Sequence, residues 1–514
     1  MTESLAQKWG TLDGRKGDLI ARCEQYAMWT DPSICPVENE DGAEQSRGNV
    51  TIGARLVNHL ANRVVDTMFP SDRPFFALAL SPEARTRLEE EMDEDALVQY
   101  FAALRQATAK AEEAAVRKLN LTAYRPVAIL AVSHQIVTGN VVLLRLDDDT
   151  RVAYGVKDFC CVRDIRGKVT QMLLRDSKQY ESLTPELQEL VKHKRPELKD
   201  GDSCTLYTYF WKQRNRWHSK QDIDEVEVPR SKASYKQEDC PFLALVWNLS
   251  RGENYGRGLV EAHAAAFHNI DVTTQAMLDL IGIAADIKFL VDPGSGIDID
   301  ELNTAARGAY VPGRKDEIST PDFPKRVEIQ LLREAIETWQ RDLSQAFLLS
   351  SGGVRDAERV TAEEIRFYAR ELESAYGGLY SRLALDWQKQ EADYLISQID
   401  MRLFSDSGIK IFDTTVTTGL ESLSREGQLD ALRLAISDLQ MLEAVPEDVR
   451  AAINPRVFAE FVFTNRGVKL IEFLYTQQEM QANQQAAMQQ QQQLMNQQAE
   501  ANISEAAGKK AVES

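Results

Sequence analysis

The sequence predicts an α+β protein, mainly helical with one β-rich region, on three observations. Apolar residues recur at helical spacing through most of the first 137 residues and again after residue 258. Between residues 151 and 250 the pattern changes to short apolar runs bounded by turn residues, which is typical of antiparallel strands. Two further helical stretches flank a segment without a helical period and predict an out-and-back pair of helices. A β region inserted among helices is the α+β arrangement.

The amino-terminal segment predicts four helices and two strands. Helices are expected over residues 1–30, 51–68, 83–119 and 123–137, and strands over residues 73–80 and 141–146. Asp31-Pro32 ends the first helix, because proline cannot continue one. The second helix is the most regular, with an apolar residue at every fourth position from Ile52 to Met68. Thr138-Gly139-Asn140 forms the turn that leads into the second strand.

The β-rich region predicts hairpins. Residues 162–164 and 169–174 flank Ile165-Arg166-Gly167-Lys168, which has the composition of a hairpin turn. One face of a further strand carries Thr205, Tyr207, Tyr209 and Trp211. Residues 213–215 predict a turn more weakly, because no glycine follows Asn215. The last strand is expected over residues 242–247.

The carboxyl-terminal half returns to helices after the glycine-rich turn at residues 254–258. The two helices of the out-and-back pair are expected over residues 258–283 and 329–349, with a small α/β excursion between them. Thr361 and Glu364 form a capping box that begins a long helix, and Gly377-Gly378 predicts a bend in that helix. A strand is expected over residues 409–417 and a small helical subdomain over residues 421–475.

The Gln-rich tail from Thr476 to Gln498 allows two interpretations. Weak apolar positions repeat every seven residues, at Phe473, Met480, Ala487 and Leu494, which favours a helix packed against other helices in an oligomer. The alternative is a disordered tail of low complexity.

Composition limits the classes of function. The chain has 514 residues, and 60 Lys and Arg stand against 79 Asp and Glu, giving a net charge of −19. Such an acidic chain is a poor general binder of nucleic acid, because phosphate binding needs cationic side chains. The amino terminus has no signal-peptide pattern, and no apolar run approaches the roughly 18 residues of a membrane span. We therefore expect no membrane partner.

The cysteines predict a protein made in a reducing cytoplasm. The six are Cys23, Cys35, Cys160, Cys161, Cys204 and Cys240, and none forms a Cys-x-x-Cys pair. We expect all six to be reduced thiols, mostly buried. Cys160 and Cys161 are adjacent in a strand, so their side chains are expected on opposite faces.

Catalytic constellations are not found in the sequence. It has no Walker-type phosphate loop, no Gly-x-Ser-x-Gly elbow and no His-Glu-x-x-His pair. Asp147-Asp148-Asp149 suggests a cation site, but three consecutive aspartates after a strand are better explained as a turn. Gly256-Arg257-Gly258 opens a helix and offers its amides to an anion, although a plain turn again explains it better. We expect no enzyme activity, no cofactor and no metal.

Several short motifs, in order along nearly the whole chain, resemble the portal (head-to-tail connector) proteins of short-tailed phages of the podovirus or autographivirus type. The motifs are Thr138-Gly139-Asn140-Val141, Arg163-Asp164, Gln171-Met172, Arg175-Asp176, Cys240-Pro241-Phe242, residues 254–258, residues 358–366, residues 374–380, residues 417–421 and Gly427-Gln428. Each is weak alone, and the specificity lies in their order and spacing. The Gln-rich end also fits.

The resemblance implies a portal fold whose parts follow the predicted segments. The implied parts are the wing (residues 1–257, then a long wing helix and strand at 360–415), two stem helices (258–283 and 329–349), the clip (284–328), the tunnel loop (350–359), the crown (416–470) and a Gln-rich helical barrel and tail (471–514). The family assembles as a dodecameric ring at one capsid vertex of the virion. The ring forms in the host cytoplasm.

The resemblance also implies the function and its partners. The ring forms a channel through which double-stranded DNA is packaged and later ejected. It docks the terminase large subunit first and the tail adaptor protein afterwards. Further implied partners are the major capsid and scaffolding proteins and the internal core proteins.

The implied site residues lie in the tunnel loop and the clip. Arg355 and Arg359 are expected to form basic rings around the DNA, with Gly352 and Gly353 giving the loop its freedom. Arg359 has a second interpretation, since it also stands within reach of Glu363 and Glu364 at a helix start. In the clip, Lys288, Arg307, Arg314 and Lys315 face terminase, adaptor or DNA, or else form an ordinary solvated surface.

Two other classes of function compete with the portal interpretation. The first is an acidic helical scaffold or adaptor protein of the virion without a DNA channel. The second is a nuclease, which needs clustered Asp and Glu on adjacent strands, a spacing that the sequence does not offer.

Overall fold

The computed structural model describes most of the first 285 residues and parts of the remainder. The described residues are 4–37, 48–70, 74–80, 86, 88, 90, 92, 94–237, 239–285, 290–291, 300, 304, 318–319, 326–349, 374, 378–398, 412–416, 436–438, 458 and 461–462. The chain forms two compact units. The first contains residues 1–67 and 122–387, and the second contains residues 68–121 and 388–514. Helix and sheet are mixed in both units, as the sequence predicts.

The amino-terminal helix is broken, so the prediction of one helix over residues 1–30 was wrong. Helix α1 (Leu5–Asp13) is followed by a 3-10 turn, η1 (Gly14–Lys16), and by α2 (Gly17–Trp29). The break turns the side chain of Lys16 into the protein, where Nζ donates hydrogen bonds to the carbonyl oxygens of Val156 and Phe159 at 2.8 Å each. Two glycines at the break lower the cost of leaving the helix.

Helix α6 (Tyr124–Thr138) is the central helix of the first unit. All eight residues from Ala131 to Thr138 are buried, and α2 and the strands β2 (Asn140–Arg145) and β3 (Arg151–Tyr154) pack around the helix. Helix α3 (Gly53–Met68) also follows its prediction closely. A helical segment that is buried on all sides carries few charges, and from Ala131 to Thr138 the one ionisable side chain is His134.

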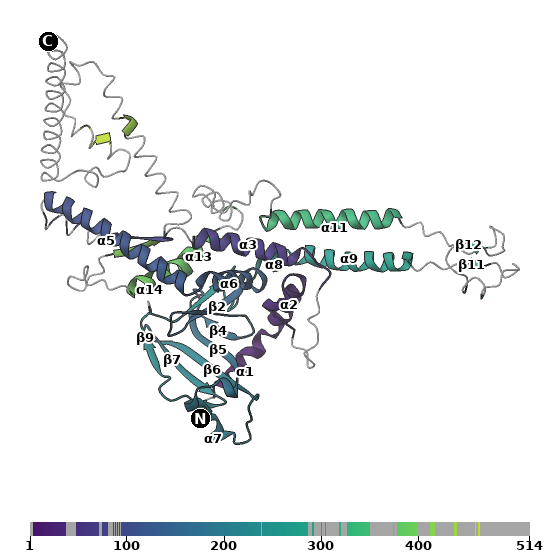
Figure 1. The fold of residues 1–514 in the computed structure, drawn as a ribbon, viewed down its shortest axis with the longest axis horizontal. Helices are drawn as coiled ribbons and strands as arrows, with labels where there is room; N and C mark the ends of the chain where they lie inside the picture. Colours follow the sequence, from purple (N-terminus) through teal and green to yellow (C-terminus); the bar gives the residue numbers. More distant parts are fainter. Residues whose placement is uncertain are drawn as a thin grey trace, which may run out of the picture. The chain divides into compact units, whose positions relative to one another are not determined.

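Two antiparallel sheets complete the first unit (Figure 1). The smaller sheet has the order β10-β2-β3, from Phe242–Val246, Asn140–Arg145 and Arg151–Tyr154. The larger sheet has the order β4-β5-β6-β7-β8, with β9 also paired to β7. Its strands are Phe159–Arg163, Val169–Gln179, Ser203–Gln213, Arg216–Ile223, Val226–Glu227 and Ala233–Tyr235. These strands confirm the predicted β-rich region.

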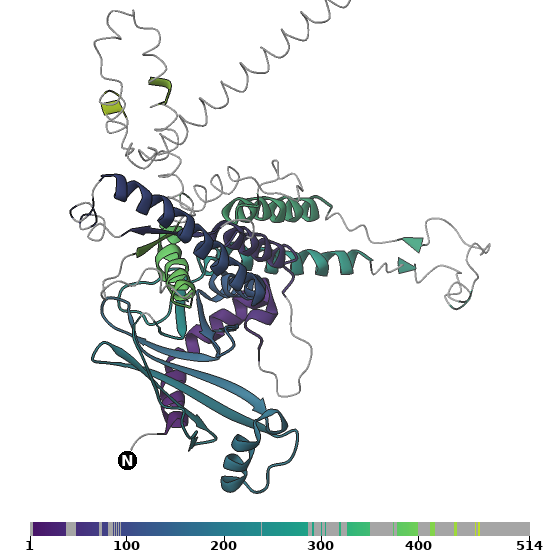
Figure 2. The same cartoon turned by 60° about the vertical axis from the view of Figure 1, so that its left-hand side comes forward.

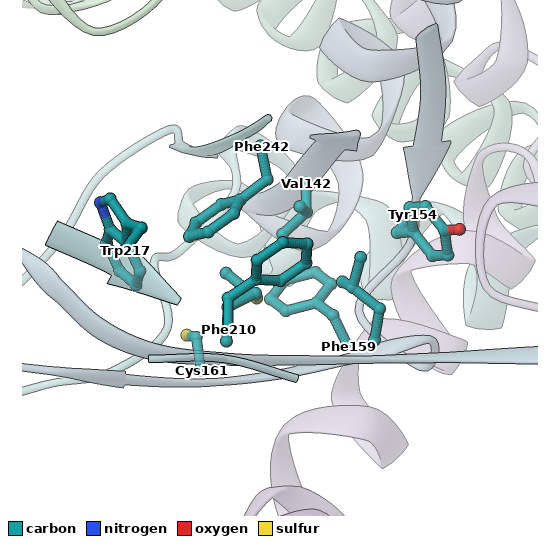
Figure 3. Packing of buried hydrophobic residues seen from close by; sticks show 9 residues of the cluster. Val142, Tyr154, Phe159, Cys161, Phe210, Trp217 and Phe242 are labelled. Carbon is teal, nitrogen blue, oxygen red and sulfur yellow. The ribbon is translucent and has the colours of Figure 1, made fainter. Parts of the chain in front are cut away.

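A core of aromatic and aliphatic side chains joins the two sheets (Figure 3). Phe242 of β10 lies 5.0 Å, ring to ring, from both Phe210 and Trp217 of the larger sheet. Cys161 belongs to this core, whereas Cys160 faces the other side and packs with Leu5 and Trp9 of α1. The alternation predicted for the two cysteines is therefore confirmed.

The cysteine prediction is confirmed for all six residues. Each thiol is free, five are buried and Cys240 is half-buried. Burial raises the pKa of the Cys161 thiol to about 11 and that of Cys35 to about 11. These thiols are protonated at neutral pH and are therefore weak nucleophiles.

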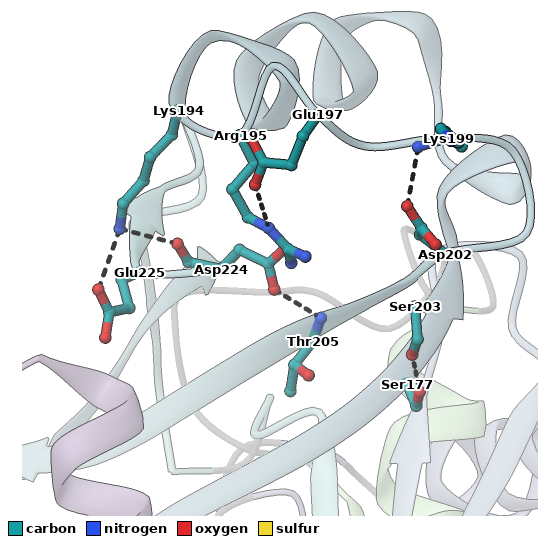
Figure 4. Close-up of polar contacts among 10 residues, drawn as sticks. All are labelled: Ser177, Lys194, Arg195, Glu197, Lys199, Asp202, Ser203, Thr205, Asp224 and Glu225. Carbon is teal, nitrogen blue, oxygen red and sulfur yellow. Dashed lines mark hydrogen bonds and ion pairs between the residues drawn. The ribbon is translucent and has the colours of Figure 1, made fainter.

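The turns between strands rely on left-handed residues. Gly167 has φ of +79° in the predicted hairpin, and Arg214 and Asn215 adopt φ of +47° and +65° in a tight turn without glycine. The helix α7 (Pro185–Lys194), which the sequence analysis missed, follows β5 and begins with proline. Asp224 ties this region to the sheet, because its carboxylate accepts the Thr205 amide at 2.9 Å and pairs with Arg195 at 2.8 Å (Figure 4).

The second unit is built on a strand pair that is distant in sequence. Strand β1 (Phe76–Leu80) pairs with β13 (Phe412–Val416) in antiparallel register, with Phe76 opposite Val416. Helix α5 (Glu94–Leu121) packs on β1, and α14 (Lys389–Ser397) packs on α5. The predicted helix over residues 83–119 is interrupted, because Met92 stands in a bend before α5 begins. Leu97, Phe101 and Leu104 of α5 form a core cluster.

Of the glycine pair at which a bend is predicted, Gly377-Gly378, the structure describes the second residue. Gly378 has φ of +85° and precedes α13 (Leu379–Leu383), which continues as a π-helical turn over Ala384–Gln388. Trp387 in this turn is fully buried, and its indole N–H donates to the Tyr124 hydroxyl at 2.6 Å. Gly377 itself, most of the clip, the capping box at Thr361 and Glu364, nearly all of the predicted subdomain at 421–475 and the Gln-rich tail lie outside the described residues.

Two glycine-containing turns lock together in the first unit, although they are 116 residues apart in sequence. The side chain of Asn140 pairs with both backbone groups of Gly256, donating to its oxygen at 2.8 Å and accepting from its nitrogen at 2.6 Å. Gly139, with φ of +78°, leaves no room for a side chain, since a Cβ there would lie 2.5 Å from the backbone of Arg257 and Gly258. We call this contact the Gly139–Gly258 lock. It joins the end of α6 and the start of β2 to the turn that precedes the helix α8.

We expect Gly139→Ala to destabilise the protein more than Gly201→Ala. Both glycines have positive φ, but a Cβ at Gly201 would meet nothing within 4 Å. Both variants carry the cost of a left-handed alanine, about 1–2 kcal/mol. Only Gly139→Ala adds the steric clash, worth about 1–3 kcal/mol more. Thermal unfolding of the two variants measures the difference, and equal midpoints would contradict the lock.

A buried histidine makes stability depend on pH. His134 on α6 is buried, and burial lowers its pKa from 6.5 to about 4. Below pH 6.5 the unfolded chain therefore takes up a proton that the folded protein does not accept until about pH 4. Stability should fall by about 3 kcal/mol across this window because of this one group.

We expect His134→Gln to make the loss of stability between pH 6.5 and pH 4 shallower by that amount. His193→Gln, which removes an exposed imidazole, provides the matched control. Chemical denaturation at several pH values measures both slopes. A slope unaltered by His134→Gln would show that the neutral buried imidazole does not determine it.

Candidate functional site

The candidate site is a pair of antiparallel helices in the first unit. A short helix α8 (Leu259–Ala262) follows the Gly139–Gly258 lock, and α9 (Ala264–Ala285) continues after a break at His263. Helix α11 (Arg326–Ala346) returns alongside α9, as both views show (Figures 1 and 2). Beyond them β11 (Leu290–Val291) pairs with β12 (Ile318–Ser319) in antiparallel register. The out-and-back pair of helices is thus observed, with α11 starting three residues before its predicted start.

The first half of α9 is held against the rest of the first unit by aromatic side chains and by the carboxylate of Asp271. Phe267 is fully buried, stacks on Trp29 at 6.3 Å and meets Phe347 edge-on at 5.9 Å. The carboxylate of Asp271 accepts hydrogen bonds from the indole N–H of Trp29 at 3.2 Å and from the amide of Asn49 at 2.7 Å. These contacts determine the direction in which α9 leaves the body.

From Val272 onward, α9 exposes apolar side chains. Val272, Leu278, Ile281 and Ile283 are 52%, 49%, 44% and 59% exposed. Within α9 only Asp271 and Asp279 carry a charge, so the helix is apolar around most of its circumference. Helices of this composition are normally buried on all sides. With about 3.6 residues per turn, Val272 and Ile283 project from one side of α9 and Leu278 and Ile281 from the opposite side. We call these four exposed side chains together the α9 apolar face.

The exposed side of α11 has a different character. Arg333, Glu334 and Glu337 are exposed there, and Arg333 Nε pairs with Glu337 at 3.0 Å within the helix. Its buried residues Ile336 and Leu343 lie on the other side. The two helices therefore present unlike surfaces, one apolar and one charged. Leu331, 59% exposed, is the large apolar exception on α11.

The predicted site residues of the tunnel loop and the clip fall outside the described part of the chain. They are Arg355, Arg359, Gly352 and Gly353 in the loop, and Lys288, Arg307, Arg314 and Lys315 in the clip. Their roles stay predictions. The α9 apolar face is not among the sites predicted from the sequence. Its signal was present, since residues 264–285 contain two charges in 22 positions.

The two weak ligand motifs of the sequence are engaged in turns. The carboxylate of Asp148 accepts the Thr150 amide at 3.0 Å and the Thr150 hydroxyl at 2.6 Å. The amide of Gly256 is bonded to Asn140, so it is not free to hold an anion. Among the described residues no group of three or more His, Cys, Asp or Glu side chains is placed to hold a metal ion. In the same part of the chain, no helix combines the length and apolarity needed to cross a bilayer.

Comparison with known proteins agrees with the resemblance noted in the sequence. A family described as bacteriophage head to tail connecting protein matches residues 2–470. The portal protein of Enterobacteria phage SP6 is 27% identical over 477 residues, covering 92% of this chain and 90% of that protein. The portal protein of Pseudomonas phage phiKMV is 29% identical over 502 residues, covering 94% of each.

One solved structure aligns more distantly. A chain from the neck of a native gene transfer agent (GTA) particle, computed with C12 symmetry, covers 78% of this chain and 88% of its own length, at 12% identity and a TM-score of 0.34. A score this low carries no argument, so the assignment rests on the sequence comparisons. They extend over nine-tenths of the chain and of each relative. The chain belongs to the family of bacteriophage head to tail connecting proteins, together with the podovirus portal proteins of phages SP6 and phiKMV.

Proposed function

We propose that this chain is the subunit of a portal ring that surrounds a DNA channel at one vertex of the phage capsid. The observation that supports a ring most directly is the α9 apolar face. Four large aliphatic side chains there are 44% to 59% exposed in a single copy, on a helix with two charges. A second copy of the chain covers them in our proposal. The portal proteins named among the relatives support the same assignment.

The unlike surfaces of α9 and α11 favour a closed ring over a two-fold dimer. In a two-fold dimer the same patch meets itself, whereas a ring joins two different patches of neighbouring copies. The helix α9 offers an apolar patch, and α11 offers a partly charged one beside its exposed Leu331. A head-to-tail contact of this kind repeats around an axis and leaves no copy with an uncovered apolar face. The proposed number of copies is twelve.

Electrostatics suit a channel that passes DNA without holding it. A twelvefold ring would carry a net charge of about −228. An acidic wall repels the phosphate backbone, which has one negative charge per about 1.7 Å of duplex. Arg355 and Arg359 would then supply the basic rings that guide the DNA, from a loop given freedom by Gly352 and Gly353. Arg359 keeps its alternative as a partner of Glu363 or Glu364.

The remaining parts of the proposal concern partners and chain segments. The wing, stem, clip, tunnel loop, crown and Gln-rich barrel follow the boundaries given by the sequence. The clip, with Lys288, Arg307, Arg314 and Lys315, would dock the terminase large subunit and later the tail adaptor. Capsid, scaffolding and internal core proteins would contact other faces. In this proposal the chain is structural, assembles in the host cytoplasm and catalyses no reaction.

Single-particle electron microscopy of the purified protein tests the function. We expect a ring with a central channel, and in a DNA-filled ring we expect the Arg355 guanidinium to face the duplex. A monodisperse monomer or dimer at high concentration would instead support the acidic scaffold or adaptor. Guanidiniums of Arg355 and Arg359 that both point away from the duplex would overturn their proposed role.

We expect Leu278→Glu to prevent ring assembly while leaving the folded subunit intact. The substitution places a charge in the α9 apolar face, and a buried unpaired charge is strongly unfavourable at an interface. Leu121→Glu is the matched control, because Leu121 is 82% exposed at the end of α5, far in sequence from the α9 apolar face. Sedimentation velocity measures the assembled fraction. Rings formed equally by both variants would show that α9 does not make the contact.

A further inference from the structure

A cleft of about 290 Å³ opens in the first unit, and none of its lining residues belongs to the α9 apolar face. One wall comes from the amino-terminal helices, with Leu12, Arg15, Leu19 and Arg22. The other walls come from β4, at Cys161 and Val162, and from residues 253–257. The break between α1 and α2 contributes to this shape, because η1 places Arg15 at the rim between Leu12 and Leu19. No role proposed above uses this cleft.

The rim of the cleft carries more positive than negative charge. Arg257 pairs with Glu253 at 3.0 Å and with Glu261 at 3.7 Å, and Arg22 pairs with Glu261 at 3.3 Å. Arg15 is exposed and has no carboxylate partner among the residues that the structure describes. Two carboxylates therefore neutralise two of three guanidiniums. The third is free to bind a ligand.

A fourth guanidinium stands beside the same wall. Arg163 donates to the backbone oxygens of Asn254 at 3.0 Å and Gly167 at 2.8 Å, and its charge also acts on the carboxylate of Asp386, which does not line the cleft. The chain has a net charge of −19, whereas arginines outnumber carboxylates around the cleft. The local charge of the cleft is therefore positive, opposite to that of the whole chain. Arginine binds carboxylates through paired hydrogen bonds, and this geometry makes such contacts specific.

The inner surface of the cleft is apolar. Leu12 and Leu19 are half-buried on the helical wall, and Val162 faces them from β4. A ligand that fits must therefore combine an aliphatic or aromatic group with an anionic one. Pockets that bind small groups share this arrangement of apolar walls and a few fixed polar groups.

We propose that this cleft binds an acidic segment of a partner protein, with a carboxylate on Arg15 and an adjacent apolar side chain between Leu12 and Leu19. Duplex DNA fits less well, because a recess of this volume cannot admit a phosphate backbone that runs along a duplex. The cleft is a docking site separate from the ring contact, so it does not depend on ring assembly.

Fluorescence polarisation with a labelled peptide of alternating glutamate and leucine tests the cleft on the full chain. We expect saturable binding that Arg15→Glu weakens at least about tenfold. Leu19→Ser should weaken it as well, by removing apolar contact. Arg117→Glu is the matched control, since Arg117 is an exposed arginine on α5 and should leave binding unchanged. A peptide with lysine in place of glutamate should not bind.

Three results would overturn the proposal. Equal binding by Arg15→Glu and Arg117→Glu would show that the peptide does not use the cleft. Competition of the peptide by short duplex DNA would show a phosphate site instead. Loss of rings in Arg15→Glu, seen by electron microscopy, would show that a neighbouring copy fills the cleft. Rings that persist while peptide binding is lost support a separate partner.

Discussion

The position of the helix pair depends on the contact between Gly139 and Asn140 on one side and Gly256 to Gly258 on the other. Three glycines bring two backbones closer than any side chain would allow, and one buried asparagine satisfies both polar groups of Gly256. Buried backbone groups need such partners. The contact lies between the central helix α6 and the first turn of α8. From there Phe267 and Asp271 direct α9 away from the body.

Different residues therefore stabilise the folded subunit and make the proposed contact between subunits. The sheets and α6 form a core that is complete in one copy, as the buried residues around Phe242 show. The second half of α9 lies beyond that core and keeps its aliphatic side chains exposed. Apolar side chains that are already buried in the core of one copy are not available for contacts between copies. Carrying it on a projecting helix lets one copy fold before copies meet, which suits a ring built from identical subunits.

The sequence predicted the local structure well where the residues of a single helix, strand or turn are enough to determine it. The alternation of Cys160 and Cys161, the hairpin at Gly167 and the helix at 51–68 follow from short-range spacing. The break after Asp13 could not be predicted, because it depends on Lys16 reaching carbonyl oxygens of residues 156 and 159. The motifs at 138–141 and 254–258 were recognised separately, yet their mutual contact is a property of the fold. The cleft at Arg15 arises from the same long-range packing. The predicted site residues in the tunnel loop and clip lie outside the described residues. The proposed function is therefore argued from the helix pair α9 and α11.

Hydrogen exchange of α9 tests whether a second copy covers the α9 apolar face. We expect the amides of residues 272–283 to exchange more slowly in the assembled protein than in a non-assembling variant. Strand β6, which lies in the core of a single copy, should exchange at the same rate in both. Equal exchange of residues 272–283 in the two states would contradict the account, because a second copy that covers the α9 apolar face must protect the helix beneath it.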